Sequence, residues 1–173
     1  MRRLWTGNPG EKTLSYVGAF FDTVIVSSKI TGKVTGNHGV YTVSAEMVDK
    51  MLVSACSCYI GKGGYCHHCE ALVLTYLQEP ASFTEISMKK REDVHKVGDL
   101  HSYLQGVTLE ALLKQLSDRK ITQKAMAEGL GMNPRHLSML KSAEARNRPA
   151  NELGATKLAC LWLLEHADEF KGA

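Results

Sequence analysis

Three cysteines and one histidine within a short window carry the clearest chemistry in this chain. Cys56 and Cys58 form a C-x-C pair, and Cys66 and His68 form a C-x-H pair. Thiolate sulfur and imidazole nitrogen are ligands that Zn²⁺ prefers, and a structural zinc site takes four of them. Either spacing can place both donors of a pair on the same side of an extended or turning backbone. The glycine-rich stretch between the pairs can fold back, so the residues predict one structural Zn²⁺ ion.

Two neighbouring residues offer further ligands. His67 lies beside His68, and Cys69 forms a C-x-x-C pair with Cys66. A simpler alternative is that all of these are ordinary buried cysteines beside a solvated histidine pair. Four of the five cysteines of the chain fall in this one stretch, which favours a metal site over scattered packing residues.

The compartment bears on whether the cysteines form disulfides. Arg2 and Arg3 stand near the amino terminus, but no apolar stretch of signal-peptide length follows them. We therefore expect a cytoplasmic protein, in the host cytoplasm if a phage encodes it, where thiols stay reduced. No apolar run approaches the ~20 residues of a membrane span, so no membrane partner is expected.

The residues around the cluster predict a pattern of secondary structure. Upstream, residues 24–44 alternate apolar and polar side chains around a Gly-Asn-His-Gly turn, which predicts a β-hairpin. Downstream, residues 69–77 predict an apolar helix that ends before Pro80. Together with the C-x-C and C-x-H pairs, this arrangement resembles the SWIM-type zinc finger over residues of about 20–80.

The resemblance implies which histidine binds the metal. In the family pattern the ligand is the histidine two residues after the third cysteine, which is His68 here. The residues that follow it belong to an apolar helix, so Cys69 would face the core. A Cys66/Cys69 pair stays the competing assignment. Either set gives four protein ligands and no open position for water, so we expect the metal to stabilise a fold rather than to catalyse a reaction.

A second pattern begins at Thr122. Thr122 can cap a first helix, Gly131 can end it in the left-handed conformation, and Asn133 followed by Pro134 can start a second helix. A small residue, Ala127, stands four positions before Gly131. The apolar positions of the pattern are Met126, Leu130, Met132, Leu137 and Leu140. This stretch resembles the helix-turn-helix of phage-repressor (lambda repressor-like) proteins, within a domain of about residues 107–170.

This second resemblance implies contacts with duplex DNA. The outer face of the second helix would lie in the major groove. Arg135 suits a bidentate guanine contact, and Asn133 or Ser138 could reach neighbouring base edges. Gln123 and Lys124 stand where the motif meets phosphate. The other predicted contacts are Met139 and Ser142 on the same helix face, and Arg146 and Arg148 in the polar loop that follows. The simpler interpretation of this face is a plain solvated helix surface.

Formal charge is concentrated around the second pattern. Residues 107–148 hold eight Lys or Arg against four Asp or Glu, whereas the whole chain has a net charge of +3. A basic segment favours polyanionic partners through counterion release. The charge therefore agrees with a nucleic-acid partner without identifying one.

These patterns predict an α+β protein of two domains. Residues 1–87 would form the SWIM-like domain, a small β-hairpin plus a helix, and residues 88–106 a linker or short polar helix. Residues 107–173 would form an all-α helix-turn-helix bundle of four to five helices, with flanking helices at 109–116 and 151–170.

The function that follows is sequence-specific binding of duplex DNA by a small transcriptional regulator of phage or mobile-element type. The alternative is a protein-interaction factor, an inhibitor or mediator that acts on a host repair, recombination or nuclease complex through the zinc domain. A homodimer stays open, because proteins with this motif often read two half-sites. No catalytic constellation stands out in the sequence, so we do not expect an enzyme.

Overall fold

The computed structural model describes residues 7–63 and 65–170, and it is of mixed α+β class, as predicted. The chain forms two compact units. The first extends to Ser87 and also takes in Arg146–Arg148, and the second consists of Met88–Ala145 and the chain from Pro149 onward. Each unit has its own cluster of buried side chains.

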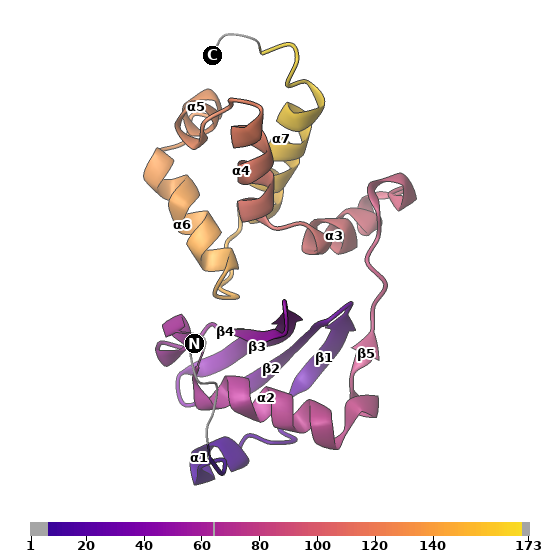
Figure 1. The fold of residues 1–173 in the computed structure, drawn as a ribbon, viewed down its shortest axis with the longest axis vertical. Coiled ribbons are helices and arrows are strands. Elements are labelled where there is room, and N and C mark those ends of the chain that lie inside the picture. The colour runs from indigo at the N-terminus through magenta and orange to yellow at the C-terminus, as the bar shows by residue number, and fades with distance from the viewer. Residues whose placement is uncertain (1–6, 64, 171–173) are drawn as a thin grey trace. The chain divides into compact units, whose positions relative to one another are not determined.

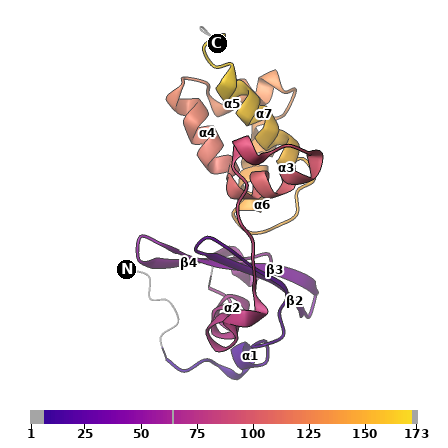
Figure 2. The same cartoon turned by 90° about the vertical axis from the view of Figure 1, so that its right-hand side faces the viewer.

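A five-stranded sheet forms the centre of the first unit (Figure 1). Its strands are β1 (Phe21–Val26), β2 (Lys29–Gly36), β3 (Gly39–Val48), β4 (Met51–Cys56) and the two-residue β5 (Thr84–Glu85). They lie in the order β4-β3-β2-β1-β5, with antiparallel pairs from β1 to β4 and β5 parallel to β1. Helix α2 (His67–Gln78) covers one face of the sheet, and the short helix α1 (Glu11–Leu14) lies against α2 (Figure 2).

Two tight turns set the register of the central strands. The predicted hairpin turn is present between β2 and β3, where Gly36 pairs with Gly39 and the latter has φ +118°. A second hairpin, which the sequence patterns did not predict, joins β3 to β4 through Asp49 and Lys50, with φ +48° and +62°. Two left-handed residues in a two-residue loop match the right-handed twist of the strands. This second hairpin brings Cys56, the last residue of β4, beside Val43.

The core of the first unit lies between the sheet and α2. Ile30, Val34, Val43 and Ala45 are buried with Leu72 of α2, because alternate residues of a strand face the same side. The short helix α1 is fixed to α2 by hydrogen bonds as well. Thr13 Oγ1 donates to Glu70 Oε2 at 2.7 Å, and the Gly18 amide donates to Thr75 Oγ1 at 2.9 Å.

The second unit consists of helices. They are α3 (Val97–Gly106), α4 (Leu109–Asp118), α5 (Gln123–Gly129), α6 (Pro134–Glu144) and α7 (Leu153–Glu165). Leucines of α4 pack with Met126 and Ala127 of α5, Leu137 and Leu140 of α6, and Cys160 of α7. No helix in the described part of the chain is both long enough and apolar enough to span a membrane.

The predicted helix ends are confirmed. Thr122 Oγ1 accepts from the Ala125 amide at 3.1 Å, and Asn133 Oδ1 accepts from the Arg135 amide at 2.8 Å. Gly131 has φ +68°, and the amide of the next residue, Met132, donates to the carbonyl of Ala127 at 2.7 Å. This arrangement is a Schellman motif, which satisfies the last carbonyls of α5. The turn before α6 is therefore fixed by local hydrogen bonds.

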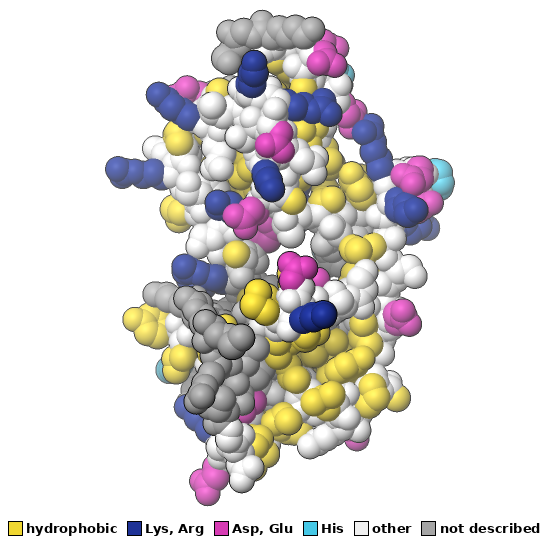
Figure 3. Space-filling view, viewed as in Figure 1, with side chains coloured by type: hydrophobic (Ala, Val, Ile, Leu, Met, Phe, Trp, Pro, Cys, Tyr) yellow, Lys and Arg dark blue, Asp and Glu magenta, His cyan; other side chains and the backbone are white. Residues whose placement is uncertain are grey.

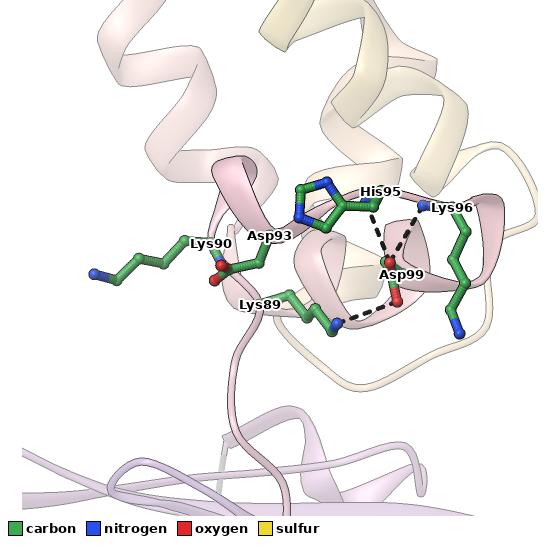
Figure 4. Close-up of polar contacts among 6 residues, drawn as sticks. All are labelled: Lys89, Lys90, Asp93, His95, Lys96 and Asp99. Atoms are coloured by element: carbon green, nitrogen blue, oxygen red, sulfur yellow. Dashed lines mark hydrogen bonds and ion pairs between the residues drawn. The ribbon is translucent and has the colours of Figure 1, made fainter.

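The segment of residues 88–106, expected to be a linker or a short polar helix, belongs to the second unit and contains α3. Asp99 on α3 is buried, and its Oδ2 accepts from the amides of His95 and Lys96 at 3.2 and 3.3 Å (Figure 4). Lys89 forms an ion pair with the other carboxylate oxygen at 3.3 Å. The carboxylate thus caps the start of α3 and ties the preceding segment to it.

A buried ion pair joins four helices of the second unit. Lys157 Nζ lies 2.6 Å from Glu144 Oε1 and donates to the carbonyl of Leu104 at 2.7 Å. Glu144 Oε2 in turn accepts from the Leu109 amide at 2.7 Å. The Lys157 side chain is only 6% exposed, so each charge depends on these partners for compensation. The pair therefore fixes the end of α6 against α3, α4 and α7.

Replacing Lys157 with Met should lower the free energy of unfolding by about 3 kcal/mol, because Glu144 would be left without its countercharge in the interior. Chemical denaturation of the variant measures the loss. Lys114→Met, the same change at an exposed position of α4, is the control and should alter stability little. A loss no larger than that of the control would contradict the role of the ion pair.

Candidate functional site

The four predicted metal ligands converge in the first unit. The ligand atoms of Cys56, Cys58, Cys66 and His68 all lie within 4.8 Å of one another, and all four residues are buried. The end of β4 supplies the first cysteine, the following loop the second, and the start of α2 the remaining two residues. Residues from a strand, a loop and a helix thus meet at one point.

The spacing of the donor atoms fits one tetrahedral metal ion. His68 Nδ1 lies 3.8 Å from Cys56 Sγ and 3.8 Å from Cys66 Sγ. Zinc bonds of the usual lengths to sulfur and nitrogen would place such donors about 3.6 Å apart. The chemistry of three thiols and one imidazole also matches a soft metal site. The cluster could therefore hold one metal ion with small adjustments of the side chains.

Backbone amides support the two cysteines of the first pair. The Cys58 amide donates to Cys56 Sγ at 3.5 Å, and the Gly61 amide donates to Cys58 Sγ at 3.1 Å. Such bonds stabilise the negative charge of a thiolate. A Cβ atom on Gly61 would lie 2.4 Å from the Cys56 carbonyl oxygen, so only glycine allows this close approach.

The thiols of the cluster also influence one another. Hydrogen bonds from Cys56 and Cys69 lower the pKa of the Cys66 thiol, because they stabilise its thiolate. The same bond raises the pKa of the Cys56 thiol. One member of the cluster is thus already favoured as an anion before a metal adds its own charge.

The alternative ligands lie close to the cluster but outside the group of four. Cys69 Sγ is 3.6 Å from Cys66 Sγ and is fully buried against the core, as the predicted helix face requires. His67 is half-buried and stacks on Tyr16 with ring centroids 5.4 Å apart. The geometry thus groups the donors in the set that the C-x-C and C-x-H spacing gave.

Aromatic rings that the sequence patterns did not single out surround His68. Tyr16 meets its ring edge to face at 4.6 Å, and Tyr41 lies 5.0 Å away. Tyr41 can lie there because Gly36 leaves room: a Cβ on Gly36 would stand 2.4 Å from the tyrosine ring. Gly36 belongs to the predicted turn, but nothing in the sequence showed that the turn makes space for a tyrosine beside a metal ligand.

The predicted DNA-contacting residues of the second unit lie on and before α6. Arg135, Ser138 and Met139 are exposed on one face of α6, opposite the buried Leu137 and Leu140. Arg135 forms no ion pair with any residue that the structure describes. Figure 3 shows Lys and Arg side chains projecting along the edge of this unit where α5 and α6 lie.

The other residues predicted to contact DNA differ in their solvent exposure. Gln123 and Lys124 are exposed on α5, and Lys124 makes only a long ion pair of 3.8 Å with Glu128. The side-chain oxygen of Asn133, Oδ1, caps α6, which leaves the side-chain nitrogen, Nδ2, to meet a ligand. Ser142 is half-buried. Arg146 and Arg148 are also half-buried and group with the first unit, so their role as phosphate contacts stays a prediction.

Comparison with known proteins gives no significant match to a protein family, a curated protein or a solved structure. The functional assignment therefore depends on the residues described above. Two features of the chain stand out on that basis: the cluster of four metal-ligand side chains in the first unit, and the exposed face of α6 in the second.

Cys58→Ser should release the metal and unfold mainly residues 20–80, because metal binding and folding are coupled in small metal-dependent modules. Metal content by plasma mass spectrometry and amide hydrogen exchange measure the two effects. Cys69→Ala is the matched control and should keep one metal ion per chain. If Cys69→Ala lost the metal and Cys58→Ser retained it, Cys69 rather than Cys58 would be the ligand.

Removing the metal with a chelator should make Cys56, Cys58 and Cys66 reactive toward iodoacetamide, while Cys160 stays protected. Cys160 is buried in the other unit, and burial raises the pKa of its thiol to about 12, so little reactive thiolate forms at pH 8. Peptide mass spectrometry counts the alkylated cysteines before and after chelation. Rapid alkylation of the three cysteines before chelation would argue against a metal at this site.

Proposed function

We propose that this chain is a zinc-containing protein that binds duplex DNA in a sequence-specific manner and acts as a small transcriptional regulator. The observation that carries the proposal is the exposed face of α6. This helix buries Leu137 and Leu140 and presents Arg135 near its amino terminus with no partner among the described residues. An arginine in that place suits a bidentate contact with guanine in the major groove.

The local geometry around α6 supports a helix-turn-helix of the phage-repressor type. The α5–α6 turn is short and fixed by a Schellman motif, and Ala127 is fully buried between the helices. A small residue there allows two helices to approach closely. The Lys157–Glu144 ion pair fixes the other end of α6. A helix held at both ends is suited to positioning base-reading side chains, and this type of motif would agree with an origin in a phage or mobile element.

The metal is proposed to be one structural Zn²⁺ ion in a SWIM-like module. Cys56, Cys58, Cys66 and His68 would hold it, and when bound it would supply a rigid cross-link between β4 and α2. Four protein ligands would leave no coordination position for water or substrate. We therefore propose that the chain is not a metal-dependent enzyme.

One observation favours a second candidate, a protein-interaction factor. A cavity of about 590 Å³ in the second unit is lined mainly by apolar side chains of α3 and α7, and Trp162 beside it is 51% exposed. Exposed tryptophan is enriched at sites of protein contact. A partner protein or a second copy of this chain could cover this surface, and the experiment below separates this candidate from the first.

Arg135→Ala should weaken binding to the preferred duplex by about 1–3 kcal/mol and relax specificity at one base pair, without loss of the fold. The preferred duplex is first selected from a random pool with the zinc-loaded protein. Fluorescence anisotropy then gives the affinity over a range of salt concentrations. Lys114→Ala removes the same charge from an exposed position of α4 and is the control.

The outcomes distinguish the two candidates. An enriched sequence, whose recognition Arg135→Ala impairs and Lys114→Ala does not, supports the regulator. A similar small effect of both variants would mean that Arg135 contributes charge alone. Absence of any enriched sequence would overturn the sequence-reading role and favour the interaction factor.

A further inference from the structure

A small cavity lies directly beside the four possible metal ligands of the first unit, two of which, Cys58 and His68, line it. Its volume is about 210 Å³, below the ~300–1,000 Å³ that is usual for drug-sized ligands. Its walls come from α1, the β2–β3 turn, β3, the loop after β4 and the start of α2. Segments that are distant in the sequence thus converge on a space with room for one ring system rather than for a larger molecule.

The walls of this cavity are largely aromatic. Tyr16, Tyr41 and Tyr59 line it, together with Ile60 and His67. His67 and Tyr16 are already stacked with nearly parallel rings, at an interplanar angle of 24°. Tyr59 is 79% exposed. Exposed aromatic faces of this kind are the platforms on which unstacked bases lie in single-strand-binding proteins.

Lys12, Asn37 and His38, which line the cavity, can each donate hydrogen bonds. Lys12 lies on one wall, and Asn37 and His38 come from the β2–β3 turn. No carboxylate is among the described residues that line the cavity. A ligand with several acceptor atoms is therefore favoured over a cation.

The charge of the site argues against a free multivalent anion. A Zn²⁺ ion held by three thiolates and one neutral imidazole has a net formal charge of about −1. Lys12 offsets this charge, so the surroundings of the cavity are close to neutral. A neutral ring that accepts hydrogen bonds suits such a site better than a phosphate alone.

His68 provides a further indication of a ligand. It lines the cavity and is 4% exposed, and its Nε2 is a buried nitrogen without a hydrogen-bond partner. With Nδ1 directed at the sulfurs, Nε2 is the atom left to hold the ring proton. Unpartnered buried donors are uncommon, because each loses its bond to water. This nitrogen has almost no accessible surface, so an acceptor atom of a ligand would bond to it only after a shift of the side chains that cover it.

We propose that this cavity binds a nucleobase, a flat nitrogen heterocycle with hydrogen-bond acceptors, supplied by a single-stranded nucleic acid or by a free nucleotide. The tyrosines stack on the ring, and the donors of Asn37, His38 and Lys12 meet its acceptor atoms. The site lies in the first unit and uses none of the residues proposed to read duplex DNA.

The test uses the full zinc-loaded chain and three probes. They are a fluorescent single-stranded DNA of mixed sequence, an abasic strand of equal length, and the four nucleoside monophosphates as competitors. The abasic strand has the same phosphates without bases, so it measures the electrostatic part of the affinity, including any part due to the second unit. The strand with bases should bind at least about tenfold more tightly than the abasic strand.

Variants of Tyr59 connect this difference to the cavity. Tyr59→Ala should reduce the preference for bases by about tenfold, and Tyr59→Phe should keep it, because stacking needs the ring and not the hydroxyl. Tyr65→Ala is the control in the same loop, since Tyr65 does not line the cavity. Zinc content is measured for each variant, so that loss of the metal is not mistaken for loss of the ligand site.

Equal affinity for the two strands, with no binding of any monophosphate, would overturn the proposal, as would an unchanged base preference in Tyr59→Ala. Competition by a monophosphate at similar affinity would assign the site to a free nucleotide, and its absence would assign the site to a strand. Arg135→Ala should leave the base preference unchanged. Failure of duplex reading and failure of the base site are therefore separate results.

Discussion

The convergence of Cys56, Cys58, Cys66 and His68 within 4.8 Å is the constraint on which the first unit depends. The β3–β4 hairpin must end at the correct residue to deliver the first sulfur, and α2 must begin directly after Cys66, its N-cap, to deliver the last two ligand atoms. A shift of β4 by one residue would turn its side chains to the opposite face of the sheet. The register of the strands and the start of the helix are thus coupled through a single point.

The same constraint explains the close packing around the cluster. The sulfurs and His68 Nδ1 contact one another and nearby amides, and one metal ion would bind all four ligand atoms together. The glycine at Gly61 allows the loop to approach Cys56, and the glycine at Gly36 allows Tyr41 to lie over His68. A side chain at either position would displace a ligand or the residue that supports it. The group of four possible metal ligands and the cavity beside it thus share the residues that position them.

Local patterns could be predicted from the sequence, and long-range contacts could not. The ligand spacing, the caps at Thr122 and Asn133, and the β2–β3 turn depend on residues a few positions apart, so type and spacing were sufficient. The Asp49–Lys50 turn was not predicted, because it contains no glycine although both residues are left-handed. The pairing of Lys157 with Glu144 joins separate helices and has no local pattern. Nor did any pattern place tyrosines around His68.

On these proposals, the two units would offer nucleic acid two different kinds of contact. The exposed face of α6, where Arg135 has no ion-pair partner among the described residues, would meet the edges of stacked base pairs, whereas the small aromatic cavity would hold a base outside the stack. One covalent chain that holds both would convert a second binding event into an intramolecular one. Neither of the two proposed sites would then need a high affinity by itself. On these proposals, the chain would bind most tightly to a nucleic acid that carries both a preferred duplex and an unpaired base, and its selectivity would come from that combination.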